Sequence, residues 1–557
     1  MATTTATAPP ARGGRALKRE IGVIGMLWAS VGSIIGSGWL FGAKNGLVTA
    51  GPAAVISWAI GGVAVLVLAL VHAELGGMYP VSGGSARFPH YAFGGAAGAS
   101  FGWFSWLQAA TVAPIEVSAM ISYAQHYSFA SGWLDSAGLL TPSGIAVAVL
   151  LMAVLSAVNF LGVRALALTN STATWWKIAI PLLAIFAIAM GGGGLHTANF
   201  TAADGFAPGG VQGVLAAVST SGIIFSYLGF EQADQLAGES TNPKRDVPLA
   251  IIGSVVIGVV LYVALQVVFL LALPSSAIGS TWAQTTGGAF GAADGLWSGP
   301  WAALATVAGL GWLAAVLYAD AIVSPGGTGL IYTAATSRVS YGLARNGYVP
   351  AFFERVSSRG VPWVGVLTSF VIGCVCFLPF PSWQSLVGLI TSASVLMYAG
   401  APLSLAVFRK RLPEADRPYR LPVAGVLAPL AFVISNLIIL WTGWDTDWKL
   451  GVAILIGYAI LGLSRVTGST SHAPHLHWRS AQWLPVYLVG MGAVVFASGY
   501  GDGEGWLGVW SSLAVTALFS LVIHYWAVAV ALPAEEIREM LAEVADDEDA
   551  LPGLPSH

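Results

Sequence analysis

Five ionisable side chains interrupt long apolar stretches of this 557-residue sequence: Glu116, Lys177, Glu231, Asp234 and Asp320. A charged group within a lipid bilayer is costly, so such residues usually serve an ion path, a proton relay or a substrate site. Lys177 follows Trp175 and Trp176 and precedes an apolar run. This lysine can hold and release a proton, or its ammonium group can replace a bound cation. The structural alternative is that its long side chain reaches the membrane interface.

Carboxyl groups provide the other candidates for proton transfer. Glu231 and Asp234 are three residues apart, and residues at this spacing share a helix face. Glu231 is the stronger candidate for carrying a proton, with a hydrogen-bonded structural carboxyl as the alternative. Asp234 could instead satisfy neighbouring backbone groups. Glu116 follows Pro114 and could face the same cavity.

Two stretches rich in small residues lie in the segments that must position these groups. Residues 31–39 read Val-Gly-Ser-Ile-Ile-Gly-Ser-Gly-Trp, and glycine weakens a helix. Backbone groups freed at mid-membrane depth are tolerated only in a protein-lined or watery cavity, so this stretch predicts a binding site for a small polar solute. Residues 324–329, which follow Asp320, read Ser-Pro-Gly-Gly-Thr-Gly. They either weaken their helix or allow close helix packing.

The composition is that of an integral membrane protein. Hydrophobic residues make up 56% of the chain and charged residues only 9%, whereas a soluble domain has roughly 25% charged residues. Cys374 and Cys376 are two residues apart in one apolar segment, which disfavours a disulfide or a zinc site. The three histidines at His472, His475 and His477 are assigned to a solvated loop. We find no catalytic constellation and no nucleic-acid-binding feature, and we expect no enzyme activity, cofactor or metal.

Fourteen apolar segments approach the roughly 20 residues that a membrane-spanning helix needs. They cover residues 21–43, 51–78, 96–124, 142–163, 172–191, 211–237, 248–273, 301–337, 362–380, 384–408, 423–441, 449–466, 482–499 and 506–531. Residues 1–20 are expected to form a disordered cytoplasmic tail, and residues 532–557 an acidic one. The segments within 421–531 carry no chemical motif and are assigned as four accessory helices.

The distribution of basic residues predicts the orientation, because Lys and Arg favour the cytoplasmic side of a membrane. With the N-terminus inside, 20 of the 23 Lys and Arg residues fall in cytoplasmic segments. Lys44 and Lys449 fall outside, and Lys177 lies within a helix. This bias predicts a multi-pass protein of the cell membrane with both termini in the cytoplasm. The bias supports an even number of helices. Twelve helices would preserve most of it, so twelve remains an alternative to fourteen.

Four groups of motifs resemble those of amino-acid permeases of the amino acid–polyamine–organocation (APC) superfamily. They are Gly-Ser-Ile-Ile-Gly-Ser-Gly at 32–38, Ala-Glu-Leu-Gly at 73–76 with Pro-Val-Ser-Gly-Gly-Ser at 80–85, Phe-Ser-Tyr-Leu-Gly-Phe-Glu at 225–231 with Gly-Glu-Ser-Thr-Asn-Pro-Lys-Arg-Asp-Val-Pro at 238–248, and Ser-Arg-Val-Ser-Tyr-Gly-Leu-Ala-Arg-Asn-Gly at 337–347. The resemblance covers about residues 20–420. A count of fourteen helices is similar to the cationic amino-acid transporter branch, while Ile-Gly-Ser-Gly-Trp-Leu-Phe at 35–41 is more similar to bacterial aspartate–proton symporters.

The resemblance implies an all-α, five-plus-five inverted-repeat fold like that of the leucine transporter. The ten-helix transport core would cover residues 21–420, with repeats at about 21–191 and 211–408 and with the first and sixth helices unwound at mid-membrane. Glycine-interrupted segments at matching positions of two repeats independently indicate a binding site. Phe225 matches a gating aromatic, Glu231 a proton-sensing glutamate, and Lys177 a helix-five lysine that ties this helix to helices one and eight.

Helix-end electrostatics then assigns the backbone groups. The carboxylate of an amino acid should meet the N–H groups of Gly36, Ser37 and Gly38. Its ammonium group should meet carbonyl oxygens at half-helix ends, which are supplied by Ser33, Ile34, Phe225, Ser226 and Leu228. Glu116, Asp234 and Asp320 remain further intramembrane candidates.

We therefore expect a secondary active amino-acid transporter in the lipid bilayer, importing its substrate with protons by alternating access. A proton-independent exchanger, a polyamine or cation transporter, and an amino-acid sensor that does not transport are the alternatives. Acidic, neutral and cationic amino acids all remain candidate substrates.

Overall fold

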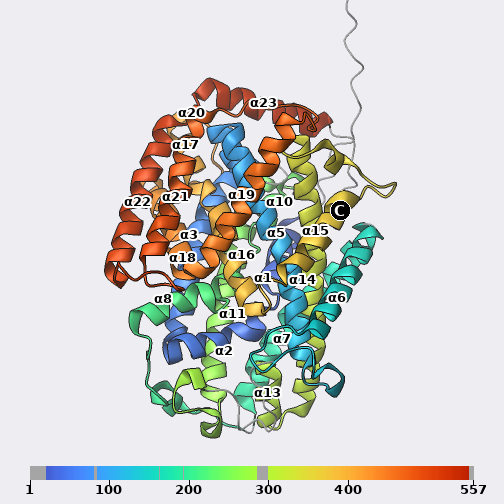
Figure 1. Cartoon of the computed structure of the whole chain (residues 1–557), viewed down its shortest axis with the longest axis vertical. Coiled ribbons are helices and arrows are strands. Elements are labelled where there is room, and N and C mark those ends of the chain that lie inside the picture. Colours follow the sequence, from blue (N-terminus) through green and yellow to red (C-terminus); the bar gives the residue numbers. More distant parts are fainter. Residues whose placement is uncertain (1–20, 81–83, 162, 192, 285–298, 551–557) are drawn as a thin grey trace, which may run out of the picture.

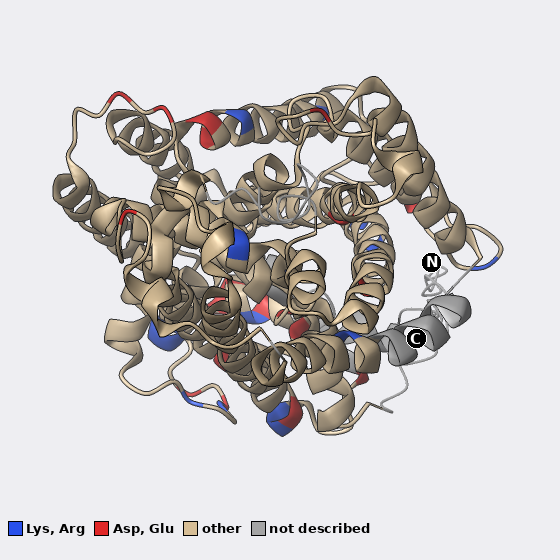
Figure 2. Cartoon of the chain, turned by 90° about the horizontal axis from the view of Figure 1, so that it is seen from below, with Lys and Arg blue, Asp and Glu red and all other residues tan. Residues whose placement is uncertain are grey.

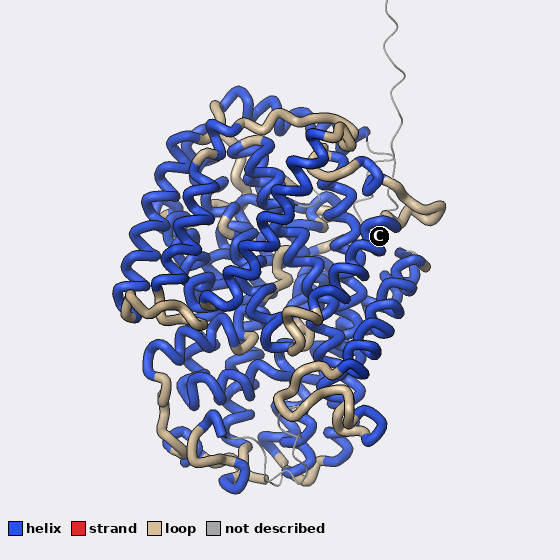
Figure 3. Tube along the Cα trace, in the orientation of Figure 1, coloured by secondary structure: helices blue, strands red, loops and turns tan. Residues whose placement is uncertain are grey.

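Helices make up most of the described residues in the computed structural model (Figure 3). The structure describes residues 21–80, 84–161, 163–191, 193–284 and 299–550. Within these ranges the only β pairings are isolated bridges, one of which joins Ile21 to Ser240. The expected N-terminal tail, residues 1–20, lies outside the described residues, as does the end of the C-terminal tail at 551–557.

Each of the fourteen expected segments contains helix. The helices are α1 (Val23–Ile34), α2 (Gly38–Ala50), α3 (Ala54–Met78), α4 (Gly84–Phe93), α5 (Gly95–Ala124), α6 (Pro142–Phe160), α7 (Val163–Met190), α8 (Gly210–Thr220), α9 (Ile223–Tyr227), α10 (Gln232–Gln235), α11 (Pro243–Ala272), α13 (Pro300–Val307), α14 (Gly311–Arg345), α15 (Trp363–Cys376), α16 (Trp383–Tyr398), α17 (Gly400–Arg411), α18 (Ala424–Thr442), α19 (Trp444–Val466), α20 (Trp478–Ala481), α21 (Trp483–Ala497), α22 (Val509–Val530) and α23 (Ala534–Ala550). Within the described ranges, nine helical stretches are long and apolar enough to cross a membrane, and four apolar helices are shorter. The count of fourteen spans stays a prediction.

Two spans are interrupted near their middle, at the positions that the sequence indicates. The first span ends α1 at Ile34 and resumes as α2 at Gly38. The sixth is divided into α8, α9 and α10. Gly222 and Gly229 flank α9 with φ values of 89° and 118°, a region of backbone space that residues with a Cβ rarely adopt. Glycine is therefore required at both turns.

The helix through residues 324–329 is not interrupted. α14 runs without a break over 35 residues and carries Pro325 inside it. Close packing explains part of this stretch, because a Cβ at Gly329 would lie 2.9 Å from Leu155 of α6. The sequence offered two alternatives for this stretch, a weakened helix or close helix packing. Close packing fits Gly329, and the helix does not break here.

The second half of the first span extends further than expected. α2 ends at Ala50, whereas the apolar segment was expected to end at residue 43. Lys44 was assigned to the segment outside the membrane that follows this helix, whereas the helix continues through it; the side of the membrane on which it lies stays a prediction. Lys44 lies within α2 at 4% exposure, and its Nζ donates a hydrogen bond to Asn45 Oδ1 at 2.9 Å.

The helices form a bundle with α23 at one end and α2 and α13 at the other (Figure 1). Seen from the end that holds α2 and α13, few positions carry Lys, Arg, Asp or Glu (Figure 2). α5 and α14 pack against each other in the interior, as do α3 and α11. These helices surround the two interruptions and position the site described next.

Candidate functional site

A small cavity lies where the interrupted spans meet α5, α14 and α16. Its lining residues are Ser33, Ile34, Gly36, Gln108, Val112, Glu116, Phe225, Leu228, Thr328, Tyr332 and Ile390. The cavity encloses about 10 Å³, which is roughly the space that one water molecule needs. An amino acid therefore does not fit until surrounding groups move, and the structure represents a closed state of this site.

The interruption in the first span is occupied by a side-chain carboxylate. The Ser37 N–H points to both carboxylate oxygens of Glu116, at 3.1 and 3.4 Å. The Gly36 N–H donates to the Ile34 carbonyl at 3.2 Å. A Cβ at Gly36 would lie 2.6 Å from Glu116 Oε1, so this carboxylate reaches the backbone only because residue 36 is glycine. Glu116 thus holds one of the three amides that the sequence assigned to a substrate carboxylate.

The residues whose backbone N–H and C=O groups were predicted to bind the substrate come together only in part. Ser33, Ile34, Phe225 and Leu228 line the cavity, whereas Ser37, Gly38 and Ser226 lie beside it. The Ile34 carbonyl already accepts a hydrogen bond from Tyr262 Oη at 2.8 Å. Ser226 packs on Gly38, where a Cβ would lie 3.0 Å from the Ser226 Cα.

The two interruptions pack directly on each other. A Cβ at Gly229 would lie 2.7 Å from the Ser33 Cβ and 2.9 Å from the Ile34 nitrogen. This close approach places the ends of four half-helices around one point. It is the arrangement that the glycine-interrupted segments predict.

Lys177 lies buried beside the cavity, at 1% exposure. Its Nζ donates to the Gly32 carbonyl at 3.0 Å and to Thr328 Oγ1 at 2.6 Å. The side chain therefore does not reach the membrane interface. It joins α7 to α1 and α14, which is the connection between helices five, one and eight that the family resemblance implies.

Glu231 lies at the end of the second interruption, directly before α10. Its carboxylate accepts hydrogen bonds from the Gly229 N–H at 2.9 Å, from Tyr398 Oη at 2.6 Å and from Tyr332 Oη at 3.4 Å. Tyr332 also lines the cavity. Glu231 is thus connected to the cavity wall through one hydroxyl group.

The two remaining carboxyl candidates do not line the cavity. Asp320 is buried on α14 and accepts hydrogen bonds from Trp176 Nε1 at 2.8 Å and Ser324 Oγ at 2.5 Å. Asp234 is buried against Gly76 of α3, where a Cβ would overlap its Oδ1 atom. Asp320 accepts a hydrogen bond from Trp176, the residue that precedes Lys177 in the chain. Asp234 instead contributes to the packing of α10 on α3.

Sequence reasoning missed several residues of the site. Trp383, at the start of α16, donates from Nε1 to Ser37 Oγ at 2.9 Å, and its ring centroid lies 5.9 Å from that of Phe225 and 4.8 Å from that of Phe41. These rings cover one side of the cavity. Trp383 lay just before an expected segment that began at residue 384.

Gln108 could have been found from its spacing. Gln108, Val112 and Glu116 recur every fourth residue in α5, and all three line the cavity. Thr328 and Tyr332 of α14 show the same spacing. Polar residues spaced in this way in an apolar helix share one face, and that face here points to the site.

Comparisons with known proteins agree with this geometry. The amino acid permease family matches residues 21–464. A glutamate/serine transporter, AimA, of Bacillus subtilis is 34% identical over 94% of this chain and 96% of its own length. An aspartate-proton symporter of the same organism is 32% identical over 93% of this chain and 97% of its own length.

The fold also matches a solved transporter. Mhp1, of the nucleobase-cation-symport-1 family, was solved in a closed conformation. It superimposes with a TM-score of 0.51 over 98% of this chain and 100% of Mhp1, at 12% sequence identity, so the likeness concerns the fold alone. The leucine-transporter-like fold is therefore confirmed, and the chain belongs to the amino acid permease family of the APC superfamily and is a membrane transporter of amino acids.

Proposed function

We propose that this transporter imports an acidic or small polar amino acid together with protons, by alternating access. The relatives named for glutamate, serine and aspartate support this substrate class, and the aspartate-proton symporter supports the coupling. The amino-acid side chain itself is assigned by this analogy alone.

The observation that carries the proposal is the hydrogen bond between Glu116 and the Ser37 amide. A substrate carboxylate would meet the same N–H group, since an amide at the start of a half-helix favours an anion. Glu116 and the substrate therefore compete for one donor. Protonation would weaken the hold of Glu116 on this amide, because a charged acceptor forms the stronger hydrogen bond. Substrate binding and proton uptake are thereby linked.

Lys177 supplies the second half of this linkage. Its ammonium group lies within hydrogen-bond distance of the Gly32 carbonyl and Thr328. In its charged form it ties α1 to α7 and α14. Loss of its proton would weaken this attachment and free α1 to move.

The closed cavity requires that opposite sides open in turn. Trp383 and Phe225 cover one side, and Glu231 with Tyr398 lies at the other. We propose that helices one, two, six and seven rock against the rest of the core, so that each cover opens alternately.

The test uses proteoliposomes of the purified protein with an imposed pH gradient and labelled aspartate, glutamate and serine. Glu116→Gln keeps an oxygen for the Ser37 amide but cannot change its charge. We expect the variant to lose accumulation driven by the pH gradient while it retains exchange of labelled for unlabelled substrate. Glu414→Gln, at an exposed acidic residue, is the matched control.

Gradient-driven accumulation by Glu116→Gln at the wild-type level would contradict this role. Wild-type uptake that needs substrate inside the vesicles, and ignores the pH gradient, would identify an exchanger instead. Competition by unlabelled amino acids of each charge class then measures the side-chain preference.

A further inference from the structure

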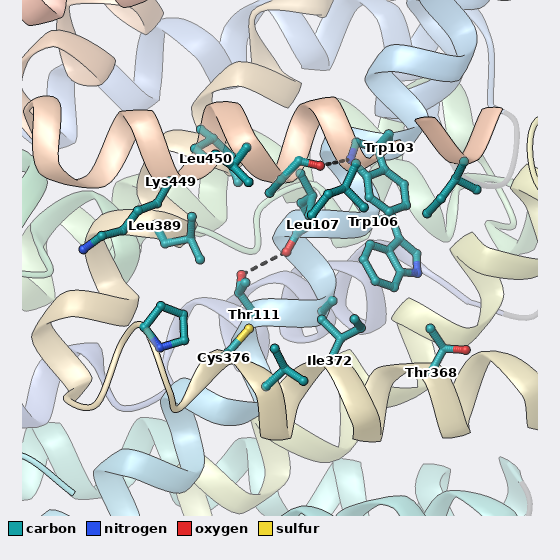
Figure 4. Close-up of a pocket in the computed structure, with 18 of the residues that line it drawn as sticks. Trp103, Trp106, Leu107, Thr111, Thr368, Ile372, Cys376, Leu389, Lys449 and Leu450 are labelled. Carbon is teal, nitrogen blue, oxygen red and sulfur yellow. Dashed lines mark hydrogen bonds between the residues drawn. The ribbon is translucent and has the colours of Figure 1, made fainter. Parts of the chain in front are cut away.

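A second and much larger cavity lies between α15 and α19, away from the cavity at the helix interruptions. It encloses about 430 Å³, within the range of roughly 300–1,000 Å³ that small-molecule sites occupy. α5 and α16 form its floor, and α15 and α19 form its sides (Figure 4). Lys449 lies at one end and Trp103 and Trp106 at the other (Figure 4).

Most polar side chains along the length of this cavity already have hydrogen-bond partners within the protein. The indole N–H groups of Trp103 and Trp106 donate to the Ala453 carbonyl at 3.0 Å and to Ser340 Oγ at 2.7 Å. The hydroxyls of Thr111 and Thr368 donate to carbonyls of their own helices, at 3.0 and 2.9 Å. A polar amino acid would lose its hydration here without compensation. The cavity therefore fits an apolar occupant.

Its dimensions match one leaflet of a bilayer. The lining residues of α19 run from Trp448 and Lys449 to Ile460, and the 11 residue-to-residue steps from Lys449 to Ile460 correspond to roughly 16 Å of helix at 1.5 Å per step. Half of a hydrocarbon core of about 30 Å is about 15 Å. Along α19, the cavity therefore has about the length of one leaflet of the hydrocarbon core.

The cavity is continuous with the outer surface of the bundle. Val375 of α15 and Val452 and Ile456 of α19 line it and are about half exposed. In a membrane this surface faces lipid chains. At its Lys449 end, Nζ forms an ion pair with Asp445 at 3.0 Å. An ammonium group has three donors, so this pairing leaves donors for a phosphate oxygen.

We propose that this cavity is a phospholipid site, in which one acyl chain lies between α15 and α19 and the phosphate group meets Lys449. The bound acyl chain would contact Ala110 and Thr111 of α5 and Leu389 of α16. The neighbouring residues Val112 and Ile390 line the cavity at the helix interruptions. One layer of helices therefore separates the lipid from the amino-acid site, and lipid binding would steady the side of the core against which the other helices move.

The experiment uses the full-length protein in vesicles of phosphatidylethanolamine and phosphatidylglycerol, with a trace of phosphatidylglycerol that carries a diazirine on one acyl chain. After illumination, mass spectrometry maps the protein residues that the acyl chain has labelled. We expect adducts on Leu107 and Ala110, which are only 9% and 1% exposed and which bulk lipid cannot reach. Adducts confined to outward-facing residues such as Leu455, with none on α5, would overturn the proposal.

Two variants test the parts of the site separately. Ala453→Phe places a ring in the cavity and should lower the yield of α5 adducts about tenfold, equivalent to about 1.4 kcal/mol of binding. Leu455→Phe, on the same helix at a residue that is 67% exposed and does not line the cavity, is the matched control. Equal loss in both variants would contradict the site, as would no loss in either.

The phosphate contact has its own readout. Unlabelled phosphatidylglycerol should suppress the α5 adducts better than diacylglycerol with the same chains, and Lys449→Gln should abolish this difference. Equal suppression by the two lipids in the wild-type protein would overturn the assignment to Lys449. Cross-links between two copies of the chain across α15 and α19, together with absent α5 adducts, would show that a second protomer fills the cavity instead.

Discussion

Two stretches of small residues lie next to each other in this protein and behave differently. Residues 32–38 contain three glycines and two serines, and the helix stops there. Residues 324–329 contain three glycines and a proline, and the helix continues through them. Local sequence alone would favour a break in the second stretch at least as strongly, because proline disrupts a helix interior more than glycine does.

The difference lies in the partners that other helices provide. At the first stretch, Glu116 accepts from the Ser37 amide, Tyr262 donates to the Ile34 carbonyl and Lys177 donates to the Gly32 carbonyl. At the second, the Thr328 hydroxyl donates to the Ser324 carbonyl within the same helix. A helix opens at mid-membrane where other elements satisfy the freed backbone groups. Glycine permits the break, and the tertiary partners stabilise it.

Lys177 contacts both stretches, so its removal should have the largest effect. Lys177→Met deletes the bonds to Gly32 and Thr328 together with the charge. We expect proton-driven amino-acid uptake in proteoliposomes to be abolished or uncoupled from the pH gradient. Lys244→Met, at an exposed lysine paired with Asp416, should leave uptake unchanged. Wild-type, gradient-dependent uptake by Lys177→Met would refute the role of this residue.

A pair of glycine substitutions tests the comparison directly. An alanine at Gly38 would press on the Ser226 backbone, whereas a Cβ at Gly326 meets nothing within 4 Å. Uptake by Gly38→Ala should fall by about 100-fold, the order of loss that follows a 1 Å misplacement of a positioning group.

Gly326→Ala should retain uptake and raise the free energy of unfolding by roughly 0.5–1 kcal/mol, because alanine favours a helix over glycine. Transport rates and thermal unfolding of the two variants provide the readouts. Similar loss in both would mean that the second stretch also needs to open during transport.

Glu231→Gln should have a smaller effect, because the amide oxygen can still accept hydrogen bonds from the Gly229 N–H and the Tyr398 hydroxyl, which share one carboxylate oxygen. We expect the pH dependence of uptake to shift while maximal uptake persists. An unchanged pH profile, measured over the same range in both proteins, would leave Glu231 as a structural carboxyl and remove proton sensing from the second interruption.

The smallest effect is expected far from both stretches, at the end of the bundle that holds α23. Arg538 of α23 donates a hydrogen bond to Glu414 at 2.6 Å, and this contact lowers the pKa of the Glu414 carboxyl. The attachment is therefore complete above the ordinary pKa of glutamate, about 4.3, and is lost as the pH falls through the lowered value. The protection factors of the α23 amides, which correct for the intrinsic pH dependence of exchange, should fall at low pH.

Arg538→Ala should lower these protection factors slightly at neutral pH and remove their fall at low pH, without changing transport at pH 7. Both groups are exposed, and an exposed ion pair stabilises little. Protection factors in α23 that do not change with pH in the wild-type protein would mean that other contacts hold this helix.

The sequence by itself determined much of this protein. Its 9% charged residues and long apolar segments identify a membrane protein, because a bilayer admits few charges. The glycine-rich positions at 32–38 and 225–231 located both interruptions, and the isolated charge of Lys177 located a residue of the site. These features are local, since glycine content and a buried charge can be read from neighbouring residues.

Only the tertiary structure decided which weak points open and which groups meet there. Nothing local indicates that Glu116, 79 residues away, binds the Ser37 amide, or that Trp383 bonds to the Ser37 hydroxyl across 346 residues. The lipid-facing cavity between α15 and α19 likewise exists only because helices distant in sequence leave a space between them. The physical reason is that backbone groups and cavities are satisfied by whatever packs against them, and packing partners are set by the fold as a whole.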